Sequence, residues 1–171
     1  MTALQLSMYL RDRYRKPVLY LDCTEERVME HLEQAGQQKN MAGDYSNFMF
    51  EQNRIMVVKR VALQEISGWR NKGYALVVVC LGTKSPLLSD CPFCGCIFSG
   101  AVTAISRKQW ETMLLPLNMG CPVSVAVTGG DISLAAEWGE ECRINKLPPY
   151  FEVFGTSKPF KREMKLLLDK M

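Results

Sequence analysis

Residues Tyr74 to Leu81 read YALVVVCL, an unbroken apolar run that is rich in β-branched side chains. An apolar run of this length, next to a glycine and polar segments, is typical of a β-strand. Its residues do not alternate between apolar and polar, which is the pattern of a strand covered on both faces. The run therefore predicts a strand in the middle of a parallel sheet.

Shorter apolar runs on both sides of this strand alternate with helical patterns. A helical stretch at 2–14 begins the chain, and 143–151 is a short terminal strand or an extended segment. The runs that predict strands are 17–23, 54–61, 96–105 and 122–127, and the patterns that predict helices are 24–36, 63–72, 106–117, 131–141 and 157–170. This alternation predicts an α/β domain with a three-layer, doubly wound, mostly parallel sheet and right-handed crossovers.

Two of the predicted strand-to-helix junctions carry specific turn signals. Ser106 to Gln109 fits a capping box in front of an apolar helical face that includes Trp110. The sequence TGGD, Thr128 to Asp131, forms the other junction and could present backbone N–H groups to an anion. A tight turn followed by an aspartate cap explains the same residues, and we favour that interpretation.

The composition indicates a single globular domain over residues 1–171. Of the 171 residues, 47% are hydrophobic and 23% are charged. No apolar run approaches the roughly 20 residues that span a bilayer, and no leader pattern is visible, so we expect a cytoplasmic location. Seven cysteines in a reducing compartment predict free thiols. The net charge of +3 is too small to indicate nucleic-acid binding.

The N-terminal stretch TALQLSMYLRDRYRKPVLYLDCT, residues 2–24, places a helix directly in front of a strand. This order resembles the segment that follows the phosphate-binding loop in the MinD/ParA-like group of P-loop ATPases. YALVVVCLG resembles the Walker B strand of that family, VTGG its late sheet, and PPYFEVFGTSKPFK the loop that approaches the base. The resemblance extends over nearly the whole chain and implies a P-loop NTPase-like fold.

The chain departs from this family at each position that takes part in phosphoryl transfer. The glycine-rich loop and its lysine would lie upstream of Met1, which leaves Thr2 as a remnant of the loop. Asp22 fits the first of two acidic positions, and Thr24 occupies the second. The Walker B aspartate falls on or beside Cys80, and a thiol is a poor ligand for Mg²⁺. Thr2, Asp22 and Thr24 are therefore vestigial nucleotide-site positions, and no catalytic residue is assigned.

The resemblance also implies a missing strand inside the sheet. In the family the strand before the phosphate-binding loop lies between two others, whose backbone groups would be unpaired without it. The strands could close up, a segment such as 47–50 could fill the position, or a partner chain could add a strand. A native start further upstream is the remaining alternative.

The one cysteine cluster is Cys91-Pro-Phe-Cys94-Gly-Cys96. A structural zinc site needs four ligands, the only histidine is far away in the sequence, and Cys121 and Cys142 join the cluster only if the fold brings them near. CPFC also resembles the active dithiol of glutaredoxin-like proteins, but an apolar run rather than a helix follows it. A Pro/Gly turn with free thiols is favoured over zinc, and zinc over redox chemistry.

The last predicted helix has a basic face opposite an apolar stripe. The basic residues are Lys158, Lys161, Arg162 and Lys165, and the apolar residues are Phe160, Met164, Leu167 and Leu168. In the resembled family a terminal amphipathic helix can contact membrane, so peripheral membrane attachment is one hypothesis. A solvated charged face over a stripe packed on the core is the ordinary explanation, and we favour it.

The sequence favours a non-catalytic interaction or localisation module over an enzyme. Its expected partner is another protein or a second copy of the chain, without nucleic acid and without a cofactor beyond residual nucleotide. The first alternative is a nucleotide-binding ATPase whose phosphate-binding loop lies upstream. The second is a zinc or thiol protein that uses Cys91, Cys94 and Cys96.

Overall fold

The computed structural model describes residues 2–24, 49–52, 54–82, 93–114, 121–140, 142–148 and 157–169. The chain divides into two compact units, Met1–Pro92 and Phe93–Met171. Each unit contains parallel strands and helices, so the α/β class and the mostly parallel pairing are confirmed. The described strands form two separately hydrogen-bonded sheets, which corrects the expectation of one sheet. A single domain over 1–171 and the P-loop NTPase-like assignment stay predictions.

The first unit combines helix α1 (Thr2–Tyr14) with a four-stranded sheet. The strands β1 (Val18–Asp22), β2 (Met49–Gln52), β3 (Ile55–Val58) and β4 (Leu76–Cys80) lie in the order β2-β3-β1-β4. β1 pairs in parallel with β3 and β4, whereas β2 runs antiparallel to β3. The short helices η1 (Leu63–Glu65) and α3 (Ile66–Arg70) lie between β3 and β4 in the chain.

Most of the elements predicted for this unit are confirmed to within a few residues. The exceptions are the helix at 24–36, which lies outside the described residues after Thr24, and the segment 47–50. Of that segment, Met49 and Phe50 belong to β2, which lies at the edge of the sheet and pairs with β3. β2 therefore does not fill a position inside the sheet.

β4 lies at the edge of this sheet, which corrects the prediction that YALVVVCL is central. Among the described residues its backbone pairs with β1 alone, and only Val78 of its five residues is buried. The central strand is β1, in which every residue is buried. An apolar run indicates where side chains are covered, but it does not show how many neighbours the backbone has.

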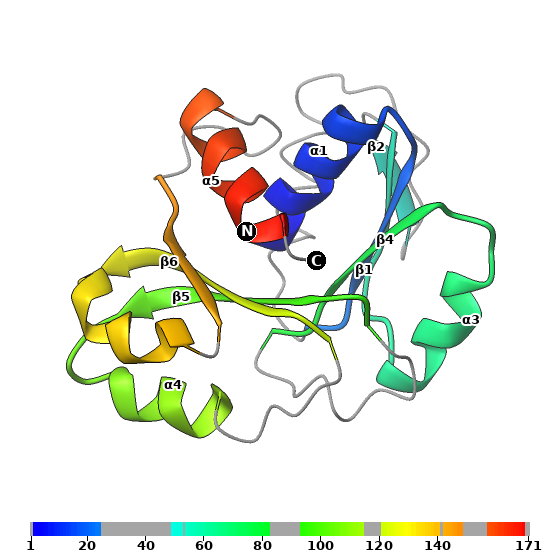
Figure 1. Ribbon diagram of the computed structural model, residues 1–171. Helices are drawn as coiled ribbons and strands as arrows, with labels where there is room; N and C mark the ends of the chain where they lie inside the picture. The colour runs from blue at the N-terminus through cyan, green and yellow to red at the C-terminus, as the bar shows by residue number, and fades with distance from the viewer. Residues whose placement is uncertain are drawn as a thin grey trace, which may run out of the picture. The chain divides into compact units, whose positions relative to one another are not determined.

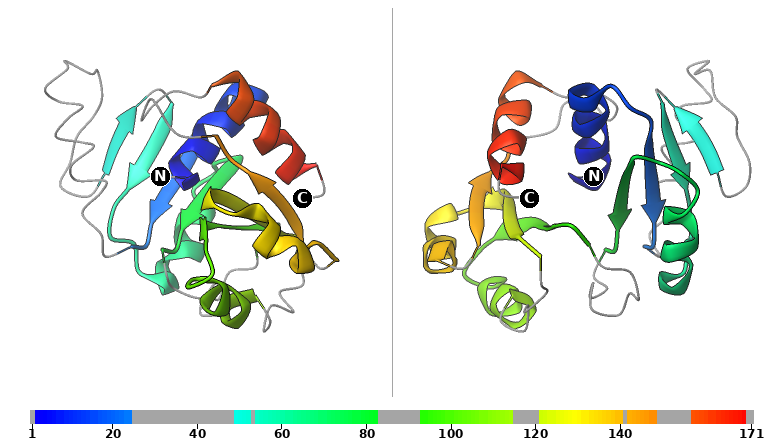
Figure 2. Two further views of the ribbon diagram at one scale, coloured as in Figure 1. Left: turned by 90° about the vertical axis from the view of Figure 1, so that its left-hand side faces the viewer. Right: turned by 45° about the vertical axis from the view of Figure 1, so that its right-hand side comes forward.

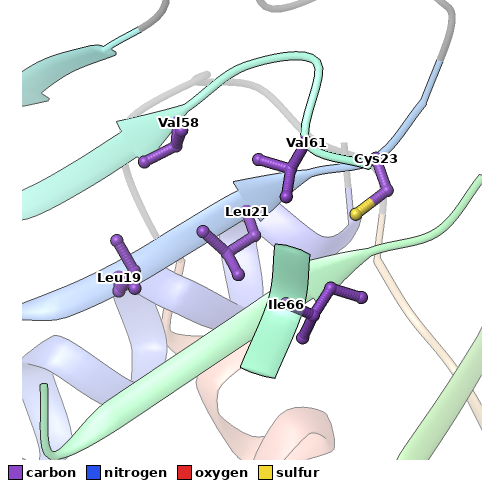
Figure 3. Packing of buried hydrophobic residues seen from close by; sticks show 6 residues of the cluster. All are labelled: Leu19, Leu21, Cys23, Val58, Val61 and Ile66. Atoms are coloured by element: carbon purple, nitrogen blue, oxygen red, sulfur yellow. The ribbon is translucent and has the colours of Figure 1, made fainter. Parts of the chain in front are cut away.

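Helices cover both faces of the first sheet, with α1 on one side and α3 on the other (Figure 1). The face toward η1 and α3 is a hydrophobic core, drawn in Figure 3, that consists of Leu19, Leu21, Cys23, Val58, Val61 and Ile66. Because side chains alternate along a strand, Val18, Tyr20 and Asp22 face the opposite side, where α1 packs.

The second unit has a parallel sheet in the order β5-β6-β7. Its elements are β5 (Cys96–Val102), α4 (Arg107–Leu114), β6 (Val123–Gly130), η3 (Ile132–Glu140), β7 (Arg143–Lys146) and α5 (Lys158–Leu168). Figure 2 shows α4 and α5 on opposite sides of the sheet. The core on the side of α4 and η3 consists of Val102, Trp110, Val125, Val127 and Ala135.

The capping box of α4 lies one turn earlier than predicted. The backbone N–H of Thr103 donates to Ser106 Oγ at 2.9 Å, and the N–H of Ser106 donates to Thr103 Oγ1 at 3.1 Å. Arg107 then donates to the carbonyl of Thr103, so Thr103 is the N-cap residue. The Ser106 hydroxyl here takes the part that Glu or Gln takes in the usual motif, so the sequence pattern does not single out Thr103.

The TGGD junction is a close backbone contact followed by an aspartate cap. β6 continues through Gly130 instead of ending at Val127, and Gly130 pairs with Val102 of β5. The carboxylate of Asp131 accepts a 2.9 Å hydrogen bond from the N–H of Ser133, and this bond lowers the pKa of Asp131. The aspartate cap of the favoured interpretation is thereby confirmed, whereas the tight turn is wrong, because Thr128 to Gly130 belong to β6.

Candidate functional site

Several polar side chains of the first unit lie at the carboxyl ends of its parallel strands. Asp22 ends β1 and is the register partner of Cys80, which ends β4. Lys59 follows directly after Val58, the last residue of β3, which pairs with Leu21. Lys59 therefore lies one residue beyond the last register pair of β1 and β3, at the same edge of the sheet. Ligands of open parallel α/β sheets bind at this edge, so it is the candidate functional site of the unit.

The N-terminus of α1 lies at the same edge. Only residues 15–17 separate α1 from β1, and α1 packs on β1, β3 and β4, so the helix runs antiparallel to the strands. Its first residue, Thr2, is buried, as is Gln5 one turn later. The structure thus brings the three predicted positions, Thr2, Asp22 and Thr24, to one edge of one sheet. A nucleotide-binding role for them stays a prediction.

Asp22 and Thr24 form a closed hydrogen-bonded turn at the end of β1. Oδ1 of Asp22 accepts hydrogen bonds from the Thr24 backbone N–H at 3.0 Å and from the Thr24 hydroxyl at 2.7 Å. Asp22 is 4% exposed, and its main-chain carbonyl accepts from the N–H of Val61. The aspartate side chain therefore stabilises the turn that follows the strand, as aspartates commonly do.

Gly82 allows the end of β4 to approach this turn. Its φ is +63°, a conformation that side chains other than glycine rarely adopt. A Cβ atom on Gly82 would lie 3.0 Å from Cγ2 of Thr24, which is closer than an ordinary contact. The Asp22–Thr24 turn is therefore packed against the chain that leaves β4.

Cys80 is a neighbour of Tyr20 on the α1 face of the same sheet. The Tyr20 hydroxyl is hydrogen-bonded to the side chain of Cys80. The pKa of Tyr20 is raised well above its usual range. Burial is the largest cause, and the neighbouring Cys80 and Asp22 add to it. The phenol therefore stays protonated to a higher pH than that of an exposed tyrosine.

As possible metal ligands, these side chains do not fit the magnesium nucleotide that the family resemblance implies. Mg²⁺ requires hard oxygen ligands in near-octahedral geometry. Here Asp22 Oδ1 already accepts two hydrogen bonds, Thr24 carries no charge, and Cys80 offers sulfur. Within the described ranges, no three His, Cys, Asp or Glu side chains are grouped so that they could hold a metal ion. We therefore derive no phosphoryl-transfer step for this edge.

Sequence reasoning missed two buried polar residues of this edge, Tyr20 and Lys59. Tyr20 lies within an apolar run and Lys59 follows one, so the strand pattern alone does not mark either residue as part of a site. The signal that could have identified Tyr20 is alternation along the strand. Tyr20 and Asp22 are two residues apart, so they share a face with Cys80, the register partner of Asp22.

The predicted cysteine cluster is only partly described, because Cys91 lies outside the described residues. Cys94 is exposed and Cys96 is half-buried at the start of β5. The side chain of Cys96 is hydrogen-bonded to that of Cys121, a residue that the sequence did not connect firmly with the cluster. Cys142 donates instead to the carbonyl of Trp138 at 3.2 Å.

The amphipathic character of α5 is confirmed. Phe160, Met164 and Leu167 are buried, and the helix packs on β6 and β7. Its outer face exposes Lys158, Arg162 and Lys165. The side chain of Ser157 caps the helix by accepting a 3.2 Å hydrogen bond from the N–H of Phe160.

Comparison with known proteins gives no relative. No protein-family model, no curated protein and no solved structure matches the chain. Among the described helices none combines the length and the apolar character that a membrane span requires. The case for a function therefore depends on the geometry of the two units.

Proposed function

We propose that the chain is a non-catalytic interaction or localisation module built on a degenerate MinD/ParA-like, P-loop NTPase-like fold. The observation that carries the proposal is the Asp22–Thr24 turn at the carboxyl edge of the first sheet. In an active ATPase of that kind the acidic side chain at this place serves metal and water. Here its Oδ1 atom accepts both donors of Thr24, at 3.0 and 2.7 Å.

The hydrogen bonds of this turn oppose a catalytic role. A hydrogen bond to a charged group contributes about 1.5–3 kcal/mol, and a metal ion at Asp22 Oδ1 would have to replace two of them. Cys80, at the position of the Walker B aspartate, is engaged by Tyr20. The edge is therefore stabilised by its own side chains and needs no ligand to satisfy them.

The expected partner is a protein or a second copy of the chain, in the cytoplasm and without nucleic acid. Support comes from β4, whose sequence LVVVC is apolar throughout although the strand pairs on one side only among the described residues. An apolar edge strand can accept a strand from another chain. The exposed Lys158, Arg162 and Lys165 on α5 support peripheral contact with an anionic membrane surface as a secondary proposal.

The test is magnesium-dependent ATP hydrolysis and equilibrium ATP binding by the purified full chain, compared with the variant Asp22→Asn. Asparagine keeps an oxygen that can accept from Thr24, so the variant should fold normally. If the proposal is right, neither protein hydrolyses ATP above background. Both proteins then bind nucleotide with the same affinity, or neither binds it. Asp12→Asn is the matched control, because Asp12 lies near the other end of α1 and pairs with Arg11.

Magnesium-dependent hydrolysis that Asp22→Asn abolishes and Asp12→Asn preserves would overturn the proposal. That outcome would favour the second candidate, a nucleotide-binding ATPase whose phosphate-binding loop is encoded upstream. The observation behind this candidate is that Thr2, Asp22 and the buried Lys59 lie at one carboxyl edge. An in-frame glycine-rich stretch ending in Gly-Lys-Thr in the genomic sequence before Met1 would support it further.

A further inference from the structure

Cys96 and Cys121 lie together at the start of the β5–β6 pair in the second unit. Cys96 is the first residue of β5 and pairs with Val123, the first residue of β6. The N–H of Cys96 donates to the carbonyl of Pro122 at 2.9 Å. Cys121 directly precedes Pro122, so the backbone places it next to Cys96.

The pairing of β5 with β6 brings Cys96 and Cys121 to neighbouring positions at the start of the two strands. Register partners in a parallel pair point to the same side, so Cys96 and Val123 share a face. Cys94 and Cys121 each lie two residues earlier, in a bend of the chain just before its strand. The thiols of Cys96 and Cys121 are in hydrogen-bonding contact, and Cys94 is close enough to affect Cys96 electrostatically.

We propose that Cys96 and Cys121 are a redox-responsive dithiol, which a low-molecular-weight disulfide oxidises to a disulfide bond between the starts of β5 and β6. Both thiols are half-buried and free in this structure. Closure requires the two sulfur atoms to move from hydrogen-bonding contact to the disulfide length of about 2.05 Å. The reversible bond would fix the start of one strand to the start of its neighbour.

The order of attack follows from the environment of Cys96. Burial, the neighbouring Cys121 and Cys94 raise the pKa of Cys96 to about 12, so this thiol stays protonated at neutral pH. Since the thiolate is the nucleophile, the protonated Cys96 is the thiol that reacts second.

The exchange is balanced in two steps. The Cys121 thiolate attacks one sulfur of the small disulfide, R–S–S–R, which forms Cys121–S–S–R and releases one thiolate, R–S⁻. Cys96 then loses its proton to solvent and attacks the Cys121 sulfur, which forms the Cys96–Cys121 bond and releases the second R–S⁻. The two protein sulfurs are oxidised by two electrons in total, and the reagent is reduced to two thiols.

The decisive experiment uses the unmodified full chain and therefore does not depend on the folding of a variant. The protein is incubated with glutathione disulfide, its remaining thiols are alkylated, and the unreduced digest is mapped by mass spectrometry. The expected product is a peptide pair joined through Cys96 and Cys121 that dithiothreitol separates.

Three variants identify the roles of the individual thiols. In Cys96→Ser the reaction should stop at the mixed disulfide of Cys121 with glutathione. In Cys121→Ser, Cys96 lacks its partner thiol, so the bond between these two positions should be absent. Cys142→Ser is the matched control, because Cys142 also precedes a strand of this sheet but bonds to Trp138. It should form the Cys96–Cys121 bond as the unmodified chain does.

Two outcomes would overturn the proposal. One is a map in which Cys96 pairs mainly with Cys94, or in which Cys96 and Cys121 stay reduced while the exposed Cys94 carries glutathione. The other is stoichiometric zinc in the purified chain that disappears in Cys121→Ser, because the thiols would then be metal ligands.

Discussion

Replacing Gly130 with alanine should destabilise the second unit strongly. Gly130 has a φ of +78° and pairs with Val102 at the end of the β5–β6 ladder. An added Cβ atom would meet the carbonyl oxygen of Val102 and would lie 2.7 Å from its carbonyl carbon. These contacts are with backbone, which cannot rotate away as a long side chain can.

The expected cost combines two effects. A residue other than glycine in this conformation costs about 1–2 kcal/mol. Forcing an extra carbon into a packed site costs about 1–3 kcal/mol more. Alanine also restricts the unfolded chain, which offsets about 0.4–1 kcal/mol of this. The net loss for Gly130→Ala should therefore be about 3 kcal/mol.

The assay is urea unfolding of the full chain, followed by tryptophan fluorescence; of the three tryptophans, Trp110 and Trp138 belong to the core next to β6. With a slope of about 1.5–2 kcal/mol per molar urea, the midpoint should fall by about 1.5–2 M. Gly129→Ala is the matched control, because its Cβ would lie 3.6 Å from the Cβ of Ala101, an ordinary contact. Equal midpoints for Gly130→Ala and the parent would refute the reasoning.

Three further substitutions test other contacts of the second unit. Trp110→Phe should cost about 2 kcal/mol in urea unfolding, because the buried indole donates to the carbonyl of Ala101 at 3.0 Å and fills the space over Gly100. Ser157→Ala should cost about 1 kcal/mol by removing the cap of α5, whereas the same change at the exposed Ser67 should cost little. Asn145→Ala should raise the pKa of Glu163, which is lowered mainly by the hydrogen bond from Asn145 at 2.9 Å and less by Arg162. Because the pKa is lowered in the folded state, this bond stabilises the unit above the ordinary value of 4.5, and that contribution is lost as the pH falls through the folded-state pKa. An NMR titration of the Glu163 carboxyl in the parent, Asn145→Ala and Arg162→Gln would check the sign, and an unchanged pKa in Asn145→Ala would contradict it.

Apolar runs and turn residues were enough to predict most of the described elements. β1, β3, β4 and α5 lie where their patterns place them, and α5 begins next to Ser157, where the predicted helix starts. The prediction was wrong about the position of β4 in the sheet. Backbone pairing is decided by which strands meet, and this depends on long-range contacts that a single run such as YALVVVCL does not encode.

The candidate sites were predictable to a similar degree. The resemblance to the MinD/ParA-like family implies Asp22 and Thr24 as site positions, and the structure brings them to one edge with Thr2. The hydrogen bonds that engage Asp22 could not be read from the sequence, since they depend on the local turn geometry. Cys121 was not connected firmly with Cys96 because the two are far apart in the chain, and only the β5–β6 register brings them together.

Ile105, in the turn between β5 and α4, is a suitable position for chemical labelling. Thr103 and Ser106 close this turn with their own side chains and main-chain groups, while Ile105 at its tip is 94% exposed. The isoleucine side chain therefore contributes almost nothing to closure. A fluorophore or an azide-bearing residue attached at position 105 should report on the tumbling of the second unit without altering its packing.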